Sequence, residues 1–175
     1  MDYKNSLNLP KTGFAMKADL VTREPQRLAQ WQTGGLYRQI QERRAGAETF
    51  ILHDGPPFAN GDVHIGTALN KILKDIIIRH QTLRGRNAPY VPGWDCHGLP
   101  IEFKVVQEMR KQAGAAEASP ATIRKECEAY ARKFIDLQRR QFQRLGVLGE
   151  WENPYLTLTP QYEADELRMF ADIVQ

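Results

Sequence analysis

The chain has 175 residues, enough for one domain with a buried core. Its 24 Lys and Arg residues against 21 Asp and Glu residues give a net charge of +3, which excludes a dedicated, strongly basic nucleic-acid clamp. The 2 cysteines exclude a disulfide framework, and no apolar run approaches the roughly 18 residues of a membrane span, so we expect a cytoplasmic protein without membrane contact.

Residues 1–46 are predicted to form a polar arm and two short helices. Thr22 followed by Pro25 indicates a helix over residues 22–32 with the threonine as its cap. A pair of glycines then interrupts the pattern, and a second helix is expected over residues 36–44. Because these elements precede the first predicted strand, we expect them to serve packing rather than catalysis.

A strand, a loop and a helix are predicted over residues 50–83. The apolar residues 50–53 predict the strand, and the Gly- and Pro-rich residues 54–62 predict the loop. An apolar repeat at i, i+3, i+4 and i+7 predicts the helix, with one face buried and the opposite face in water. The face expected to be buried consists of Ile65, Ala68, Leu69, Ile72, Leu73, Ile76 and Ile77, and the face expected to be wet of Lys71, Lys74, Asp75 and Arg79.

A second strand is predicted over residues 88–91, after this helix. A strand, helix and strand of about 40 residues form a right-handed crossover with parallel strands, so the expected fold class is α/β. Asp95 follows the carboxyl end of the second strand, which is where open α/β sheets bind ligands. A third helix is expected from Gly98 to residue 112, followed by a small-residue linker over residues 114–118.

The rest of the chain is predicted to contain two helices separated by an irregular segment. Ser119-Pro120 and Thr159-Pro160 each combine a hydroxyl cap with a proline at the first helical position. The segment 147–158 between the two helices is expected to be irregular, with a short strand at most. The second helix has no glycine or asparagine stop signal, so we expect the chain to be cut off there.

The turn from the first strand into the long helix is a candidate anion site. The N–H groups of a first helical turn have no partner within the helix, and the helix dipole favours negative charge. His53 and His64 lie close to this turn. Neither GxxxxGK nor GxGxxG is present, so an ordinary P-loop or dinucleotide fold has no support. The residues alone therefore predict a phosphate or nucleotide site of another type.

Three long strings of the sequence resemble one enzyme family. PPFANGDVHIGTALNKILKD is similar to the HIGH signature region of class I aminoacyl-tRNA synthetases. NLPKTGFAMKADLVTREP and PYVPGWDCHGLPIE resemble the isoleucyl branch of that class. The resemblance extends from Asn8 to Thr157 and implies that residues 47–175 form the first half of a Rossmann-like catalytic domain.

The signature departs from the family pattern at one position. The family has a second histidine where this chain has Thr67, so the motif reads HIGT. In the family, both histidines are taken to stabilise the phosphates of ATP. Threonine can donate a hydrogen bond but carries no positive charge, and a neutral hydrogen bond has roughly half the strength of a charge-assisted one.

The resemblance also implies a role for individual residues. In the family, the loop forms a wall of the amino-acid pocket and approaches the nucleotide, and the acid of the Trp-Asp pair binds the α-ammonium group. The implied catalytic residues are His64 and Thr67, the implied ATP-binding residues are Pro57, Asn60, Gly61, His64, Gly66 and Thr67, and the implied amino-acid-binding residues are Gly55, Pro56, Phe58 and Asp95.

Each of these roles has a simpler structural alternative. The loop can be a rigid turn, His64 a surface residue at a helix start, and Asp95 a turn or cap residue. Adjacent Cys96 and His97 lack the spacing of a structural zinc site, so zinc is not expected. The basic residues of the helix after Pro120 could face tRNA, but the intervening acids favour a solvated face.

By resemblance, the expected reaction is the ATP-dependent activation of isoleucine, with Mg²⁺ on the phosphates. The resulting isoleucyl-adenylate would then react with tRNA(Ile), and the complete enzyme is expected to be a monomer. The second family signature, Lys-Met-Ser-Lys-Ser, is absent from these residues, so we expect this segment alone to be inactive. The alternatives are a non-catalytic relative that keeps the nucleotide-binding fold and a small nucleotidylyltransferase.

Overall fold

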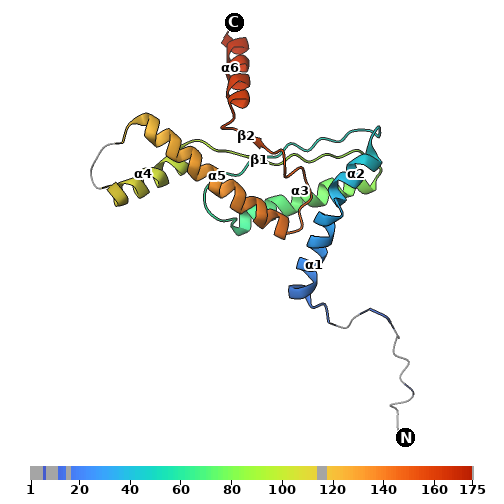
Figure 1. Ribbon diagram of the computed structural model, residues 1–175. Coiled ribbons are helices and arrows are strands. Elements are labelled where there is room, and N and C mark those ends of the chain that lie inside the picture. Colours follow the sequence, from blue (N-terminus) through green and yellow to red (C-terminus); the bar gives the residue numbers. More distant parts are fainter. Residues whose placement is uncertain (1–5, 7–11, 15–16, 114–117, 175) are drawn as a thin grey trace.

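A computed structural model describes residues 6, 12–14, 17–113 and 118–174 of the chain. A body built around α3, α4 and α5 carries the small sheet, and α1 and α6 project from it in opposite directions (Figure 1). The elements in order are α1 (Leu20–Thr33), α2 (Leu36–Arg44), α3 (Ile65–Leu83), β1 (Gly93–Trp94), α4 (Leu99–Ala113), α5 (Pro120–Arg144), β2 (Tyr155–Leu156) and α6 (Pro160–Val174).

The two predicted N-terminal helices are confirmed, but the predicted cap is wrong. Helix α1 begins before Thr22, and its N-cap residue is Asp19 with a left-handed φ of 44°. Thr22 lies inside the helix, where its hydroxyl donates to Asp19 Oδ1 over 3.2 Å. Gly35 adopts a φ of 62° between α1 and α2, a backbone conformation that glycine reaches without steric cost. The predicted glycine interruption is therefore present.

Helix α3 has the predicted bounds, but its predicted faces are reversed. Lys71 is fully buried, although it was expected in water. Lys74 and Asp75 keep only 14% and 13% of their side-chain surface exposed. Most of the predicted apolar face is instead exposed in the described structure: Ile65, Leu69, Ile72, Leu73, Ile76 and Ile77.

This reversal follows from the partners that the charged residues find. Lys71 and Lys74 both bind the buried carboxylate of Asp54, and Asp75 binds Arg79. Asp75 also accepts the backbone N–H of Leu148 over 3.0 Å. Burial of charged groups is tolerated when they are paired and hydrogen-bonded. Periodicity shows that a helix has two faces, but these ion pairs decide which face turns inward here.

The predicted strands are wrong in position, although their parallel direction is confirmed. Residues 50–53 and 88–91 have no ladder, and β1 comes later and pairs in parallel with β2. Isolated parallel bridges join Thr49 to Asn87 and Phe58 to Asp95. The extended segments that lead into the loop and into β1 thus run side by side.

The backbone of Tyr90 explains why the second strand begins late. Its N–H is hydrogen-bonded to the Tyr37 hydroxyl over 3.0 Å, and its carbonyl accepts the N–H of Glu150 over 2.9 Å. These groups are therefore unavailable for a ladder at residues 88–91. The flanking prolines have no N–H to donate.

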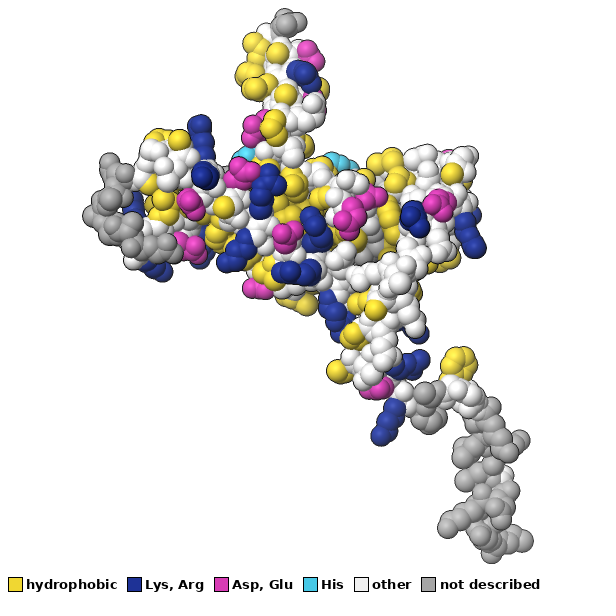
Figure 2. Space-filling model, viewed as in Figure 1, with side chains coloured by type: hydrophobic (Ala, Val, Ile, Leu, Met, Phe, Trp, Pro, Cys, Tyr) yellow, Lys and Arg dark blue, Asp and Glu magenta, His cyan; other side chains and the backbone are white. Residues whose placement is uncertain are grey.

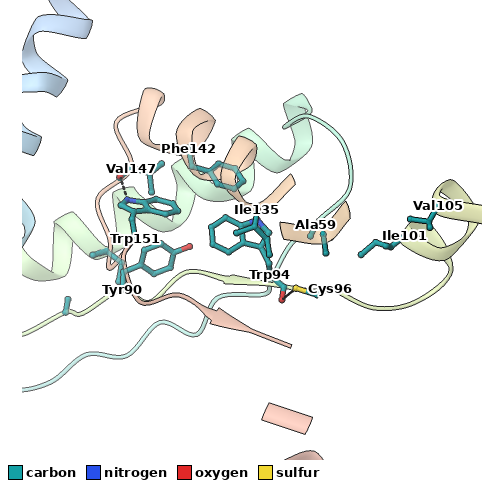
Figure 3. Close-up of a cluster of buried hydrophobic side chains, with 13 residues drawn as sticks. Ala59, Tyr90, Trp94, Cys96, Ile101, Val105, Ile135, Phe142, Val147 and Trp151 are labelled. Carbon is teal, nitrogen blue, oxygen red and sulfur yellow. Dashed lines mark hydrogen bonds between the residues drawn. The ribbon is translucent and has the colours of Figure 1, made fainter. Parts of the chain in front are cut away.

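The core lies between β1, α4 and α5. Tyr90, Trp94 and Phe142 are completely buried, and Trp151 packs against both Trp94 and Phe142 (Figure 3). Trp151 also donates its indole N–H to the Val147 carbonyl over 3.2 Å. Helix α4 closes the other end of the cluster and packs on α5.

The predicted C-terminal helices are confirmed. Ser119 caps α5 by accepting the N–H of Thr122 over 3.2 Å. The irregular segment contains the short strand β2, as expected. Helix α6 begins at Pro160, and the hydroxyl of Thr159 donates to the Leu156 carbonyl. The predicted linker lies almost entirely outside the described residues.

Helix α6 presents apolar side chains to solvent along one side (Figure 2). In the described part of the chain, no helix combines the length and apolar character that crossing a membrane requires. The exposed apolar residues of α6 are Leu167, Met169, Phe170, Ile173 and Val174.

Candidate functional site

The loop that leads into α3 is anchored at its first residue by a buried carboxylate. Asp54 accepts Lys74 Nζ over 2.6 Å, the Gly93 N–H over 3.1 Å and a close hydrogen bond from Lys71 Nζ. Burial by itself would raise the pKa of Asp54. The charge of Lys71 and the hydrogen bonds from Lys71, Lys74 and Gly93 outweigh that effect, so the pKa lies below its usual range. An ionised Asp54 therefore ties the loop to α3 and β1.

Lys71 completes this cluster from the helix side. Its Nζ also donates to the Tyr90 hydroxyl over 3.1 Å and lies 5.2 Å from the centre of the Phe142 ring. Tyr155 reaches the same loop residue from β2, because its hydroxyl donates to the Asp54 carbonyl over 2.5 Å. We call Asp54, Lys71, Lys74, Tyr90 and Tyr155 the anchor cluster.

The middle of the loop is joined directly to Asp95. The N–H of Asp95 donates to the Pro57 carbonyl over 2.9 Å, and the N–H of Ala59 donates to the Asp95 carbonyl over 2.8 Å. Phe58, between the two loop residues, is 47% exposed. An apolar ring open to solvent therefore lies in register with a half-buried carboxylate at the end of β1.

The start of α3 is capped by its own histidine. His64 has extended backbone geometry, and its Nδ1 accepts the N–H groups of Gly66 and Thr67 over 3.1 and 3.3 Å. The Nε2 atom lies 2.9 Å from the Thr67 hydroxyl oxygen. With Nδ1 as the acceptor, we assign the proton to Nε2, which can donate to that oxygen. The imidazole thus covers two N–H groups of the first turn.

A methyl group added at Gly66 would meet only the His64 ring, at 3.0 Å. A hollow of about 430 Å³ lies beside His64 and is bordered by Arg140 and Arg144 of α5. The helix start is therefore reachable from solvent, although a ligand would have to displace the imidazole to bind both N–H groups.

Comparison with known proteins identifies the family. The model of the family "tRNA synthetases class I (I, L, M and V)" matches residues 26–175. This chain belongs to that family. Among its relatives are the isoleucine–tRNA ligases of Kosmotoga olearia and Thermotoga petrophila, which are 57% and 58% identical to it over 175 residues. The chain spans 19% of the length of each of these synthetases.

A further relative, the isoleucine–tRNA ligase of Methylococcus capsulatus, is 58% identical over 173 residues, or 99% of this chain and 18% of the relative. The solved structures include the agnB2 LeuRS of Agrobacterium radiobacter K84 in a ternary complex with tRNA and LeuAMS. The match covers 90% of the chain described here and 18% of the LeuRS chain, with a TM-score of 0.65 and 24% identity. At that identity the match demonstrates a shared fold, which confirms the expected α/β class.

The structure distributes the predicted site residues over two groups. Pro57, Phe58 and Asp95 meet at the bridge between the loop and β1. His64, Gly66 and Thr67 meet at the cap of α3. The remaining predicted residues, Gly55, Pro56, Asn60 and Gly61, lie along the loop. The Gly55 carbonyl accepts a hydrogen bond from Lys74 Nζ over 3.4 Å, and Pro56 is half-buried. The Asn60 side chain donates to the Pro100 carbonyl, and Gly61 has a φ of 75°.

Asp95 also shows the simpler feature considered for it. Its Oδ1 accepts the N–H of His97 over 3.2 Å, which is a local turn hydrogen bond. Within the described residues there is no group of three or more His, Cys, Asp and Glu side chains placed to hold a metal ion. His97 Nε2 instead lies 3.4 Å from Glu163 Oε1 of α6.

The sequence did not reveal the side chains that hold the loop. Lys71, Gln138 and Gln141 were not predicted to contribute, because a polar residue in an amphipathic helix pattern is expected to be exposed. Asp54 was not predicted either, because a polar residue in a loop is expected to face solvent. The only available signal was chemical: Gln138 interrupts the apolar side of α5 and is buried between Ile135 and Phe142. On the basic side of α5, Arg132 pairs with Glu128, Arg139 with Asp136 and Arg144 with Glu24.

Proposed function

We propose that this chain is the part of an isoleucine–tRNA ligase that holds ATP and isoleucine. The proposal is supported by 57–58% identity to enzymes of that name over the whole chain. The observation that carries it is the parallel bridge between Phe58 and Asp95, because it pairs the backbone of an aromatic residue of the loop with that of an acidic residue at the end of β1. An aliphatic amino acid offers groups that complement both.

In the proposed reaction, a carboxylate oxygen of isoleucine attacks the α-phosphorus of ATP. A bond forms between that oxygen and the α-phosphorus, and the bond to the bridging oxygen breaks, so pyrophosphate leaves with its electron pair. ATP enters as its Mg²⁺ complex. The site residues position the two reactants and stabilise the developing charge, and no covalent enzyme intermediate forms.

We assign Asp95 to the α-ammonium group of isoleucine, and Gly55, Pro56 and Phe58 to the wall of its pocket. An ionised acid suits this task, since charge-assisted hydrogen bonds are roughly twice as strong as neutral ones. Rotation of His64 away from the helix would release the Gly66 and Thr67 N–H groups to a phosphate. Pro57, Asn60 and Gly61 would border the rest of the nucleotide.

The isoleucyl group would then move from the adenylate to the terminal ribose of tRNA(Ile). We propose that this step takes place in the cytoplasm and requires the larger enzyme, because this chain spans 19% of its relatives. A monomeric enzyme is the simplest arrangement consistent with a site whose assigned residues all lie in one chain.

Pyrophosphate exchange by the complete protein tests the assignment. We expect exchange of labelled pyrophosphate into ATP to depend on isoleucine and to be much slower with valine. Exchange of equal speed without isoleucine would contradict the substrate assignment.

A non-catalytic relative is the second candidate, and the structure around Thr67 favours it. The Thr67 hydroxyl lies 2.9 Å from His64 Nε2, so the residue that replaces the second histidine interacts with the first. Thr67→His in the complete protein separates the candidates. A large gain in exchange rate would show that Thr67 has weakened the catalytic site. Little change would show that other residues replace the contribution of the second histidine.

A further inference from the structure

The amide of Gln138 joins three chain segments from within the core. Gln138 lies in the middle of α5 and is 2% exposed. Its Oε1 accepts the indole N–H of Trp94 over 2.9 Å. Its Nε2 donates to the carbonyls of Phe58 and Gly61 over 3.1 and 3.0 Å. One side chain thus uses its acceptor on β1 and both of its donors on the loop.

These partners adjoin the residues of the proposed site. Trp94 immediately precedes Asp95 in the chain, and Phe58 and Gly61 enclose Ala59 and Asn60. The position of Gln138 therefore sets where the loop backbone lies relative to β1 and to Asp95, which follows β1. The bridge hydrogen bonds join the same two segments directly, so the loop is held on two sides.

The surroundings argue that this amide has a geometric role. Trp94 and Phe142 are fully buried beside it, and Ile135 is 3% exposed. A buried polar group is costly unless all its hydrogen bonds are made, whereas an apolar side chain would fill the same space without that requirement. An amide at this position fixes the position of the loop backbone through hydrogen bonds, which an apolar side chain cannot form.

Other side chains of α5 hold the same loop at its edges. Gln141 accepts the Val63 N–H over 2.9 Å and donates to Asp62 Oδ1 over 2.7 Å. The Tyr130 hydroxyl donates to Asn60 Oδ1 over 2.8 Å. Of these side chains, Gln138 is the buried one and the one that binds loop backbone and β1 together.

We propose that Gln138 is a positioning residue for isoleucine activation, which holds the Phe58–Gly61 backbone at the separation from Asp95 that isoleucine and ATP require. This inference rests on the proposed function. Gln138 acts through the loop and through Trp94, so it need not touch either substrate. Without its two donated hydrogen bonds, the loop must be ordered when the substrates bind, and substrate affinity falls.

The test compares Gln138→Met, Gln138→Glu and wild type in the complete enzyme. Methionine keeps the length and burial of the side chain, and glutamate keeps an acceptor for Trp94 but loses both donors. The same change at Gln143, on the same helix and without a hydrogen bond to the loop, is the matched control. Pyrophosphate exchange is measured against isoleucine and ATP concentration, with active-site titration of each protein.

We expect the KM values for isoleucine and ATP to rise roughly 10-fold or more in both Gln138 variants, since each lost hydrogen bond weakens binding about fivefold. The titrated active fraction should remain near that of wild type, and Gln143→Met should stay within about twofold. A merely structural role would instead lower the active fraction and leave both KM values unchanged.

Unchanged KM values, or the loss of titratable sites in both Gln138 variants, would overturn the positioning role. If wild type lacks isoleucine-dependent exchange, the proposed function falls and this inference falls with it. Wild-type exchange with unaffected variants would refute the inference alone.

Discussion

The anchor cluster gives the sharpest prediction for stability. Asp54→Asn removes the charge that pairs with Lys71 and Lys74, of which Lys71 is fully buried. Asparagine has nearly the same volume, so packing changes little. The main effect is that a buried ammonium group loses its counter-charge.

Removal of one partner from a buried ion pair costs about 3–5 kcal/mol, because the remaining charge stays desolvated. Lys74 keeps 14% of its side-chain surface exposed and can turn to water, so the expected loss arises mainly from Lys71. For a chain of this size, such a loss lowers Tm by about 6–20 °C.

Urea unfolding of the chain, followed by tryptophan fluorescence, measures the change. Asp165→Asn is the matched control, because Asp165 pairs with Arg168 on the exposed surface of α6. Exposed ion pairs contribute little to stability, so the control should unfold at nearly the wild-type urea concentration.

The same variant should change how stability depends on pH. The pKa of Asp54 is lower in the folded chain than in the unfolded chain, so its contribution is complete above its unfolded pKa. That contribution is lost as the pH falls through the folded value. Asp54→Asn should therefore have a flatter acid limb in a plot of unfolding free energy against pH. A loss below about 1 kcal/mol at neutral pH, with an unchanged acid limb, would refute the reasoning.

Gly93→Ala should destabilise the chain severely, because its Cβ would lie 2.0 Å from the Tyr155 ring. Thermal unfolding checks this against Gly13→Ala, where an added Cβ meets no non-neighbouring atom of the described residues within 4 Å, and equal Tm values would contradict it. Ser119→Ala should cost about 1 kcal/mol through loss of the α5 cap, measured by urea unfolding; no change would show that the cap is dispensable. Purified residues 1–175 should show no pyrophosphate exchange, and measurable turnover would overturn the expectation that the longer enzyme is required.

The helices of this chain were predictable because they depend on local signals. The glycine pair, the Ser119-Pro120 start and the apolar repeat of α3 act within a few residues of each other, so the elements they predict are present in the structure. The strands were less predictable, since a strand is defined by what its backbone pairs with. Tyr37 and Glu150 take the backbone groups of Tyr90, and no pattern near residue 90 indicates this.

The candidate site shows the same division. Sequence strings predicted the loop, His64 and Asp95 as candidate site residues, because these residues lie within long motifs. The side chains that hold the loop come from distant positions: Gln138 reaches Phe58 across 80 residues, and Tyr155 reaches Asp54 across 101. Contacts between residues so far apart in the sequence produce no periodic pattern in it.

The sequence by itself determined which segments of this protein are helical, because neighbouring residues decide helix propensity and capping. Only the tertiary structure decided which face of α3 is buried. A lysine is unfavourable in a core until a carboxylate from another segment neutralises it, and Asp54 reaches Lys71 and Lys74 only when the loop folds back along β1.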